Sequence, residues 1–270
     1  MMMSVKFYLE GMRKMIRSLY TSVSGLIALE NKQATITNNI ANVNTTGFKG
    51  DNLSIKSFDE VLIQNKDKVS GGRNVKNPIG TLSLGAKIDS VDTRFTQGLL
   101  KSTNKPTDLA IDGRGFFAVQ SGNETVFTRD GNFRVENDGY IITNGGDRVL
   151  GINKNTGAME PIFVGTNNFV IDNYNGVNVN GTNTHSLALA DFNDYGTLTK
   201  VGDNYYTGEN PIYNTQVWAS QGYLEQSNVN ISNEMVEMIT TMRNFETNQK
   251  MVQMIDETLG KAANEIGAVN

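Results

Sequence analysis

The sequence has no cysteine, one histidine and one tryptophan among its 270 residues. Without cysteine the chain has no disulfide, no thiol nucleophile and no cysteine-based zinc site. The single histidine, His185, stands in a strand-like stretch without the histidine or cysteine partners that a metal site requires. We therefore assign His185 a structural role. A chain without cysteine also suits work outside the cytoplasm, since its folding needs no oxidation step.

Clusters of positive charge and long apolar runs are missing as well. The net charge is -4, whereas a protein that binds nucleic acid gathers Lys and Arg on one surface. No apolar run approaches the roughly 20 residues of a membrane-spanning helix. We expect no nucleic-acid partner and no membrane insertion.

The first residues lack the apolar core and the cleavage site of a secretory signal. Residues 1–14 also fit poorly with the helical pattern that follows them, and the codons of Glu10 and Gly11 are suitably spaced to form a ribosome-binding site for Met15. We interpret Met15 as the natural start, and residues 1–14 as an extension that is either non-native or disordered.

No stretch carries a convincing catalytic, cofactor or metal motif. Residues 112–116 contain Gly-x-Gly but lead into strand residues, whereas a phosphate cradle needs the amides of a helix N-terminus. The stretch from Asp191 fails as a calcium loop, because Gly202 stands where a bidentate glutamate is required. No Gly-x-Ser-x-Gly elbow occurs. We predict no catalytic residue, no cofactor and no metal, and a chain that is not an enzyme.

The longest regular pattern is the C-terminal stretch 231–266. Its apolar residues recur at alternating spacings of four and three, which is the a/d pattern of a heptad repeat. The seam is broken only by Gln249 and Asp256, with Asn230 or Ser232 as the N-cap and Glu234 in the first turn. The seam residues that we expect to drive packing are Met235, Met238, Met242, Phe245, Val252 and Leu259. A stripe this narrow favours packing against another helix.

A second helical pattern, over residues 16–43, supplies that partner from the other end of the chain. Its seam residues are Leu19, Val23, Leu26, Ile36 and Ile40. One slip of three residues, after Leu26, lies beside Gly25, which weakens the helix locally. We predict that the helix stops at Gly47 in a left-handed conformation, with Phe48 packed on Val43 as in a Schellman motif.

Between the two helical patterns the period changes to two. Residues 58–64 are predicted to form a short amphipathic segment. Residues 66–78 are polar and predicted to be mobile or ordered only by a partner, and alternation becomes clear from Leu82. Asp130-Gly131, Asp138-Gly139 and Asn144-Gly145-Gly146 are hairpin signals. The strand candidates are residues 109–111, 115–119, 126–127, 133–135, 140–142, 148–150, 169–171, 177–179, 187–189 and 205–207, and residues 211–222 are a connection back. Short strands at close intervals predict an antiparallel β domain.

The predicted fold class is α+β, in which N- and C-terminal helices pair as a coiled coil around an inserted antiparallel all-β domain. The expected domains are the extension 1–14, a terminal helical domain of residues 15–50 and 226–268, an extended and variable linking stretch 51–80, and the β domain 81–225.

Residues 36–49 carry a specific run of residues. Asn38, Asn39 and Asn42 are followed by the turn residues Thr46, Gly47, Phe48 and Lys49. This run resembles the N-terminal signature of the bacterial flagellar rod and hook family. The resemblance continues at residues 15–20, 111–117, 128–133, 202–207 and 227–230, in the family's order, and so covers nearly all of 15–266.

The resemblance implies a structural subunit of the flagellar basal-body rod, most like the family's distal rod members. It implies helical self-assembly into a hollow drive shaft that transmits torque and lines the export channel. The implied partners are copies of the chain itself, other rod and hook subunits, and the flagellar export apparatus. The implied location is the basal body, outside the cytoplasm, reached without a cleavable signal. The apolar residues beside the C-terminal seam are then predicted to contact neighbouring subunits; they are Val236, Ile239, Met251, Met254 and Ile255.

Alternatives remain at this point. The chain resembles the proximal rod and hook subunits at the same ends. A binding module or an envelope enzyme built on the β domain would use that domain without polymerising. Gln249 and Asp256 either set the register of the helices or face a wet channel.

Overall fold

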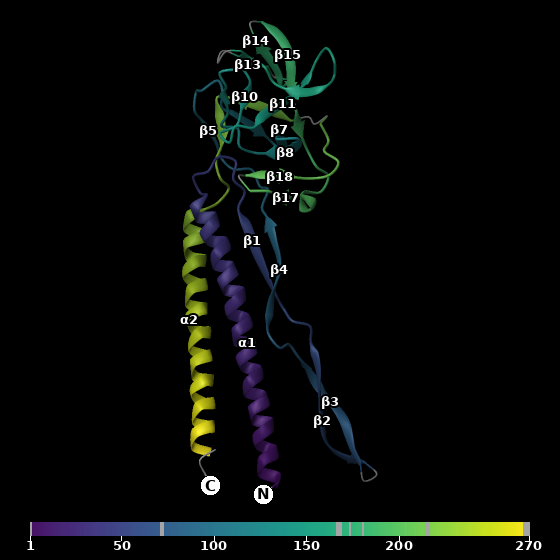
Figure 1. Cartoon of the computed structure of the whole chain (residues 1–270), viewed down its shortest axis with the longest axis vertical. Coiled ribbons are helices and arrows are strands. Elements are labelled where there is room, and N and C mark those ends of the chain that lie inside the picture. The colour runs from purple at the N-terminus through teal and green to yellow at the C-terminus, as the bar shows by residue number, and fades with distance from the viewer. Residues whose placement is uncertain are drawn as a thin grey trace. The chain divides into compact units, whose positions relative to one another are not determined.

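The computed structural model describes residues 2–70, 73–165, 169–172, 174–179, 181–202, 204–213 and 217–266. Within these ranges a long helix α1 (Met2–Ala41) opens the chain and a second, α2 (Ile231–Lys261), closes it, with a mostly antiparallel β region between them (Figure 1). A turn of π-helix, Ala262–Ile266, follows α2. The predicted order of helix, antiparallel β region and helix is confirmed.

The chain divides into two compact units. One consists of residues 1–38, 51–92 and 232–270, and the other of residues 39–50 and 93–231. These units differ from the expected domains in several places. Residues 39–50 and 226–231 group with the β domain, and residues 51–92 group with the helices. Strand pairing keeps residues 51–92 together, since β4 (Ala86–Thr93) pairs with β1 (Asp51–Ser57) and β3 (Arg73–Leu82) pairs with β2 (Val61–Ser70).

In the first unit, α1 and α2 are antiparallel neighbours. Lys32 Nζ lies 2.7 Å from a carboxylate oxygen of Glu237. A Cβ atom built on Gly25 would lie 3.2 Å from Nδ2 of Asn248, so the glycine beside the predicted slip leaves room for a side chain of the other helix. α2 begins at Ile231 with Glu234 in its first turn, which agrees with the predicted start.

The start of β4 and the residues just before it contact α1. The Thr21 hydroxyl donates to the Leu84 carbonyl at 3.1 Å, and the Ser24 hydroxyl accepts from the Ala86 amide at 3.2 Å. The amphipathic segment predicted for residues 58–64 is instead an irregular stretch, 58–60, followed by the start of β2. Most of the polar stretch 66–78 lies in β2 and β3, which pair with each other through two register shifts, so the chain itself supplies a partner for this backbone.

Both ends of α1 differ from the sequence prediction. The helix begins at Met2 rather than near Ile16, so the backbone of residues 2–14 continues it; the interpretation of residues 1–14 as non-native stays a prediction. At the other end α1 stops at Ala41, and the Schellman stop at Gly47 is wrong. The Gly47 amide donates to the Glu225 carbonyl at 2.8 Å rather than to a helix carbonyl. Asn and Thr end the helix early, because their side chains compete for backbone hydrogen bonds.

The second unit contains the β domain. Its strands are β5 (Leu100–Ser102), β6 (Leu109–Asp112), β7 (Phe116–Ser121), β8 (Glu124–Thr128), β9 (Arg134–Val135), β10 (Ile141–Ile142), β11 (Arg148–Asn153), β12 (Met159–Pro161), β13 (Phe169–Ile171), β14 (Gly176–Val179), β15 (Thr182–Leu187), β16 (Leu189–Ala190), β17 (Thr199–Lys200), β18 (Tyr205–Thr207), β19 (Trp218–Gln221) and β20 (Tyr223–Glu225). The main sheet runs in the order β13-β14-β15-β11-β7-β8-β18-β17. β19 pairs with β6 inside the stretch 211–222 that the sequence suggested was only a connection.

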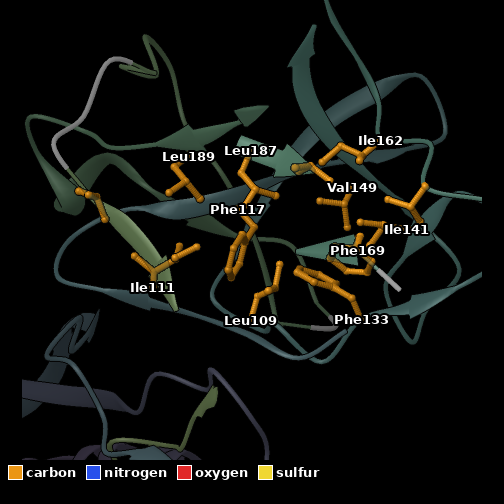
Figure 2. Close-up of a cluster of buried hydrophobic side chains, with 14 residues drawn as sticks. Leu109, Ile111, Phe117, Phe133, Ile141, Val149, Ile162, Phe169, Leu187 and Leu189 are labelled. Atoms are coloured by element: carbon orange, nitrogen blue, oxygen red, sulfur yellow. The ribbon is translucent and has the colours of Figure 1, made fainter. Parts of the chain in front are cut away.

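The main sheet is buried on both faces. Phe117 belongs to one hydrophobic cluster, with Val149 and Leu187 (Figure 2), whereas its neighbour Phe116 belongs to a second cluster with Tyr206. Because successive side chains of a strand point to opposite faces, two buried faces require consecutive apolar residues. This explains the continuous apolar run at residues 116–119, where simple alternation with polar residues would leave one face wet.

Two of the three predicted hairpins form. β9 pairs with β10 across Gly139, and β10 pairs with β11 across Gly146, with φ of 85° and 94° at the two glycines. The hairpin at Asp130-Gly131 is wrong, because β8 and β9 do not pair. Gly131 is instead packed against the Leu109 backbone, where any Cβ atom would overlap a carbonyl.

Candidate functional site

The turn residues of the N-terminal signature, Thr46, Gly47, Phe48 and Lys49, lie at a buried polar junction in the second unit. Gly47 has φ of 65°, so its left-handed conformation is confirmed. It occupies the third position of a turn, since the Phe48 amide donates to the Thr45 carbonyl at 3.4 Å. A Cβ atom on Gly47 would overlap the backbone of Arg129. Glycine is therefore required twice here, once for its conformation and once for the close approach of the β domain.

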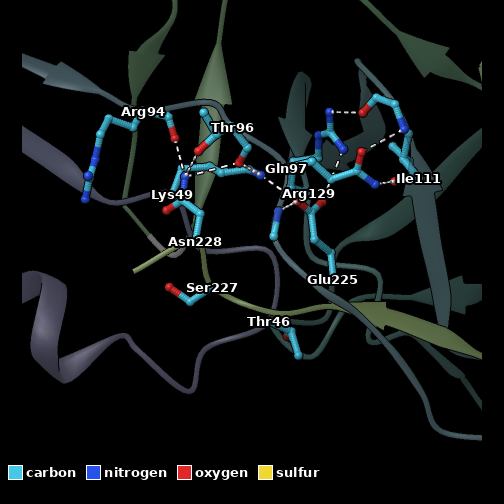
Figure 3. Close-up of polar contacts among 12 residues, drawn as sticks. Thr46, Lys49, Arg94, Thr96, Gln97, Ile111, Arg129, Glu225, Ser227 and Asn228 are labelled. Atoms are coloured by element: carbon cyan, nitrogen blue, oxygen red, sulfur yellow. Dashed lines mark hydrogen bonds and ion pairs between the residues drawn. The ribbon is translucent and has the colours of Figure 1, made fainter. Parts of the chain in front are cut away.

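Lys49 and Glu225 form the centre of the junction (Figure 3). Lys49 Nζ lies 2.6 Å from Glu225 Oε1, and both side chains are wholly buried. Nζ also donates to the Thr96 carbonyl at 2.8 Å. Burial lowers the pKa of Lys49 from its ordinary value, although the neighbouring Glu225 acts in the opposite direction. A charge that is removed from water needs such partners, because an unpaired one is strongly destabilising.

A second cation shares the same carboxylate. Arg129 Nη1 lies 3.1 Å from Glu225 Oε2, and its Nη2 donates to the Gly113 carbonyl at 2.7 Å. The Gly98 amide donates to Oε1 at 2.8 Å, so Glu225 accepts from three separate parts of the chain. Arg129 also stacks over the Phe116 ring, 5.5 Å from its centroid. The carboxylate thus joins the N-terminal segment to two loops of the β domain.

Asn228 makes a parallel connection on the C-terminal side. Its Oδ1 accepts from the Gly50 amide at 2.9 Å, and its Nδ2 donates to the Arg94 carbonyl at 2.6 Å. These bonds connect residues that leave the first helix with residues that lead into α2. The chain therefore departs from the helical unit and returns toward it through one place in the β domain.

The neighbouring signature residues also contact the β domain. The Thr46 hydroxyl lies 2.6 Å from Asp130 Oδ1, and Phe48 is buried beneath Lys200, whose Nζ lies 4.4 Å from the ring centroid. Burial raises the pKa of Asp130 above its ordinary value, although hydrogen bonds from Thr46 and Asn132 act in the opposite direction. Of the three signature asparagines, Asn39 is buried, Asn42 is half-buried and Asn38 is exposed.

The covered residues of α2 differ from the predicted seam at every second position, where the covered residue is the one just before the predicted one. The predicted Met238, Phe245, Val252 and Leu259 are half-buried, whereas Met235 and Met242 are exposed. The intervening positions are taken by the preceding residues. These are buried Glu234 and Thr241 and half-buried Asn248 and Ile255. A continuous four-three spacing of eight covered residues results, and three of them, Glu234, Thr241 and Asn248, are polar.

On α1, the predicted seam residues are also covered to different degrees. Ile36 is buried, whereas Val23 is exposed. Leu19, Leu26 and Ile40 are half-buried.

The other residues that the sequence analysis weighed as metal or phosphate sites make structural contacts. His185 Nε2 lies 2.9 Å from Glu160 Oε1 and its Nδ1 lies 3.0 Å from the Thr184 hydroxyl. Gly113 and Gly115 have φ of 108° and 123° in the turn before β7. Across the described ranges, no three acidic or histidine side chains are placed to hold a metal ion. Neither α1 nor α2, over the residues described, has an apolar stretch long enough to cross a membrane.

Sequence reasoning missed Arg129 and Glu225 as junction residues. Arg129 lies within a motif that carried the resemblance, Thr-Arg-Asp-Gly, but nothing local indicates that its side chain is buried. Glu225 ends a short strand and looks like an ordinary surface acid. A buried Lys49 would have required a carboxylate partner, and only the fold identifies which of the chain's acids it is.

Three protein families match successive parts of the chain. "Flagella basal body rod protein" matches residues 19–49, "Flagellar hook protein FlgE/F/G D1 domain" matches residues 110–184, and "Flagellar basal body rod FlgEFG protein C-terminal" matches residues 220–265. The first match ends at Lys49 and the last includes Glu225, so the two partners of the buried pair come from different matched segments.

Relatives of known name match nearly the whole chain. The flagellar basal-body rod protein FlgG of Bacillus subtilis (strain 168) is 33% identical over 93% of this chain and 99% of its own length. The flagellar hook-basal body complex protein FlhO of the same organism is 30% identical over 94% of this chain and all of its own length. The flagellar basal-body rod protein FlgF of Caulobacter vibrioides is 31% identical over 95% and 100%.

Proposed function

This chain belongs to the family of flagellar basal-body rod proteins, and on that premise we propose that it is a distal-rod-type subunit that assembles helically with copies of itself. Its function is structural, and it is not an enzyme. Proteins of this family are part of the flagellum and assemble into the rod with other rod and hook subunits. The proximal rod and the hook of the same family are the nearest alternatives.

The observation that carries self-assembly is the apolar surface left open on α2. Between about 45% and 65% of each of Met242, Met235, Ile239 and Val236 is exposed, on a helix whose covered seam faces α1. A contiguous patch of exposed apolar side chains of this kind is typical of a protein–protein interface. The occupant that we propose is the terminal helix of a second copy.

Pairing of α1 with α2 as a coiled coil is part of this proposal. The Lys32–Glu237 ion pair and the approach of Asn248 to Gly25 support antiparallel neighbours. The four-three spacing of the covered residues supports heptad packing. A polar residue such as Asn248 within such a seam favours one register over others, at a cost in stability.

The exposed apolar residues flank the covered seam on both sides. In a helix, Met235, Met242 and Ile239 follow the seam on one side, and Met251 and Met254 follow it on the other. A helix that is apolar on both flanks suits a closed tube, in which each helix has a neighbour on either side. This is the arrangement that we propose for the wall of a channel.

The β2–β3 ribbon is a second candidate contact. A two-stranded ribbon is marginally stable alone, and this one exposes Val61, Leu62, Ile79 and Leu82. We propose that neighbouring subunits cover these residues. We further propose export through the flagellar apparatus without a cleavable signal, a location in the basal body outside the cytoplasm, and Met15 as the start.

Purified full-length chain tests the proposal against the rival of a binding module that does not polymerise. Sedimentation should show polymers that grow with concentration. The double variant Val236→Glu, Ile239→Glu should stay monomeric with an unchanged circular dichroism spectrum, whereas Val170→Glu, at an exposed site of the β domain, should polymerise normally. Polymerisation of the double variant at wild-type concentrations would overturn the assignment of this surface.

A further inference from the structure

Outside residues 1–15, the sulfur atoms of this chain are concentrated in α2. The sequence has no cysteine and 11 methionines, and of the six that follow residue 15, five lie in this helix. The sixth, Met159, lies in β12. Any oxidation of sulfur outside residues 1–15 is therefore directed mainly at the helix that we propose to be the assembly surface.

Four of the five methionines of α2 are open to solvent. The exposed fractions are 50% for Met235, 45% for Met242, 44% for Met251 and 51% for Met254, whereas Met238 is half-buried on the covered seam. Oxidation of a thioether follows its exposure. In the free subunit these four sulfurs are thus available to an oxidant, and in a polymer that covers both flanks of α2 they are not.

We propose that these four methionines are an oxidation site that controls assembly, with hydrogen peroxide as the oxidant. In each reaction a sulfur lone pair attacks one peroxide oxygen and the O–O bond breaks. The sulfur becomes a sulfoxide, oxidised by two electrons, and the other oxygen leaves as water. A flexible apolar side chain is thereby replaced by a polar and chiral one.

The inference rests on the proposed function, because a sulfoxide obstructs only an interface that needs apolar surface. A sulfoxide oxygen that is buried without a hydrogen-bond donor is unfavourable, and the apolar flanks of α2 offer few donors. Methionine suits such a surface while it is reduced, because its unbranched thioether adapts to irregular neighbours. The same side chain makes assembly dependent on the redox state of the free subunit.

The test compares full-length wild type with the quadruple variant Met235→Leu, Met242→Leu, Met251→Leu, Met254→Leu. Leucine keeps the apolar volume and the helix propensity but has no sulfur. Each protein is treated with hydrogen peroxide as monomer, freed of peroxide, and sedimented over a range of concentrations. Peptide mass spectrometry measures sulfoxide at every methionine. Met159→Leu is the control, since it removes an exposed methionine outside α2.

Oxidised wild type and Met159→Leu should need a concentration about tenfold higher to polymerise, and a methionine sulfoxide reductase should restore assembly. The quadruple variant should polymerise equally well with and without peroxide. Equal polymerisation of oxidised and untreated wild type, with sulfoxide present at the four sites, would overturn this inference alone. Equal loss in the quadruple variant would overturn it as well. Failure of untreated wild type to polymerise would overturn the proposed self-assembly, and with it the inference.

Discussion

Glu225 Oε1 accepts a 2.6 Å hydrogen bond from Lys49 Nζ, although 176 residues separate them in the sequence. The pair connects the segment that follows the first helix with the segment that precedes the last. It is also out of reach of water, since neither side chain has exposed surface. The stability of this junction therefore depends on charge compensation within the protein.

Replacing Glu225 with Gln should destabilise the β domain by about 3–5 kcal/mol, because Lys49 and Arg129 would remain buried without a counter-charge. Chemical denaturation followed by Trp218 fluorescence measures this change. Glu209→Gln is the matched control at an exposed position, where we expect a change within about 0.5 kcal/mol. A Glu225→Gln variant as stable as the control would show that the ion pair does not contribute to the free energy of unfolding.

Gly47→Ala should destabilise the junction by more than the left-handed conformation alone requires. That conformation costs about 1–2 kcal/mol for a residue with a Cβ atom, and at Gly47 the new atom also overlaps the backbone of Arg129. Gly122→Ala is the control, because Gly122 has φ of 61° and open space around it. Equal losses of unfolding free energy in the two variants would mean that the close approach at Gly47 relaxes without strain.

Asp130→Asn should change the pH dependence of stability. Burial raises the pKa of Asp130 above its ordinary value of 3.8, so the native state holds a proton that the unfolded state has released. Stability is then lost as the pH rises from about 3.8 through the native pKa. The asparagine variant keeps an acceptor for the Thr46 hydroxyl and cannot titrate. Its free energy of unfolding, relative to wild type, should rise over that interval; a constant difference across it would contradict the account.

The sequence predicted the elements better than their contacts. Heptad spacing predicted α2, and short strand-like runs between turn signals predicted β7, β11 and β14, because these patterns are local. The seam on α2 was assigned one residue away at alternate positions, since a helix that is apolar on both flanks does not reveal which stripe its own partner covers. The buried carboxylate at Glu225 was not predicted at all, because its partners come from loops that only the folded chain brings together.

The most direct test of assembly through α2 is thiol cross-linking. Because the chain has no cysteine of its own, each introduced cysteine is its only thiol. Ile239→Cys introduces a single thiol on the exposed flank of α2, and Glu209→Cys places one on the β domain as a control. Basal bodies isolated from cells that carry each variant are treated with a short bifunctional maleimide. We predict that the chain is present in these basal bodies and that Ile239→Cys, but not Glu209→Cys, yields chains cross-linked to each other. Absence of the chain from basal bodies, or cross-linking that is equal in the two variants, would contradict assembly through this helix.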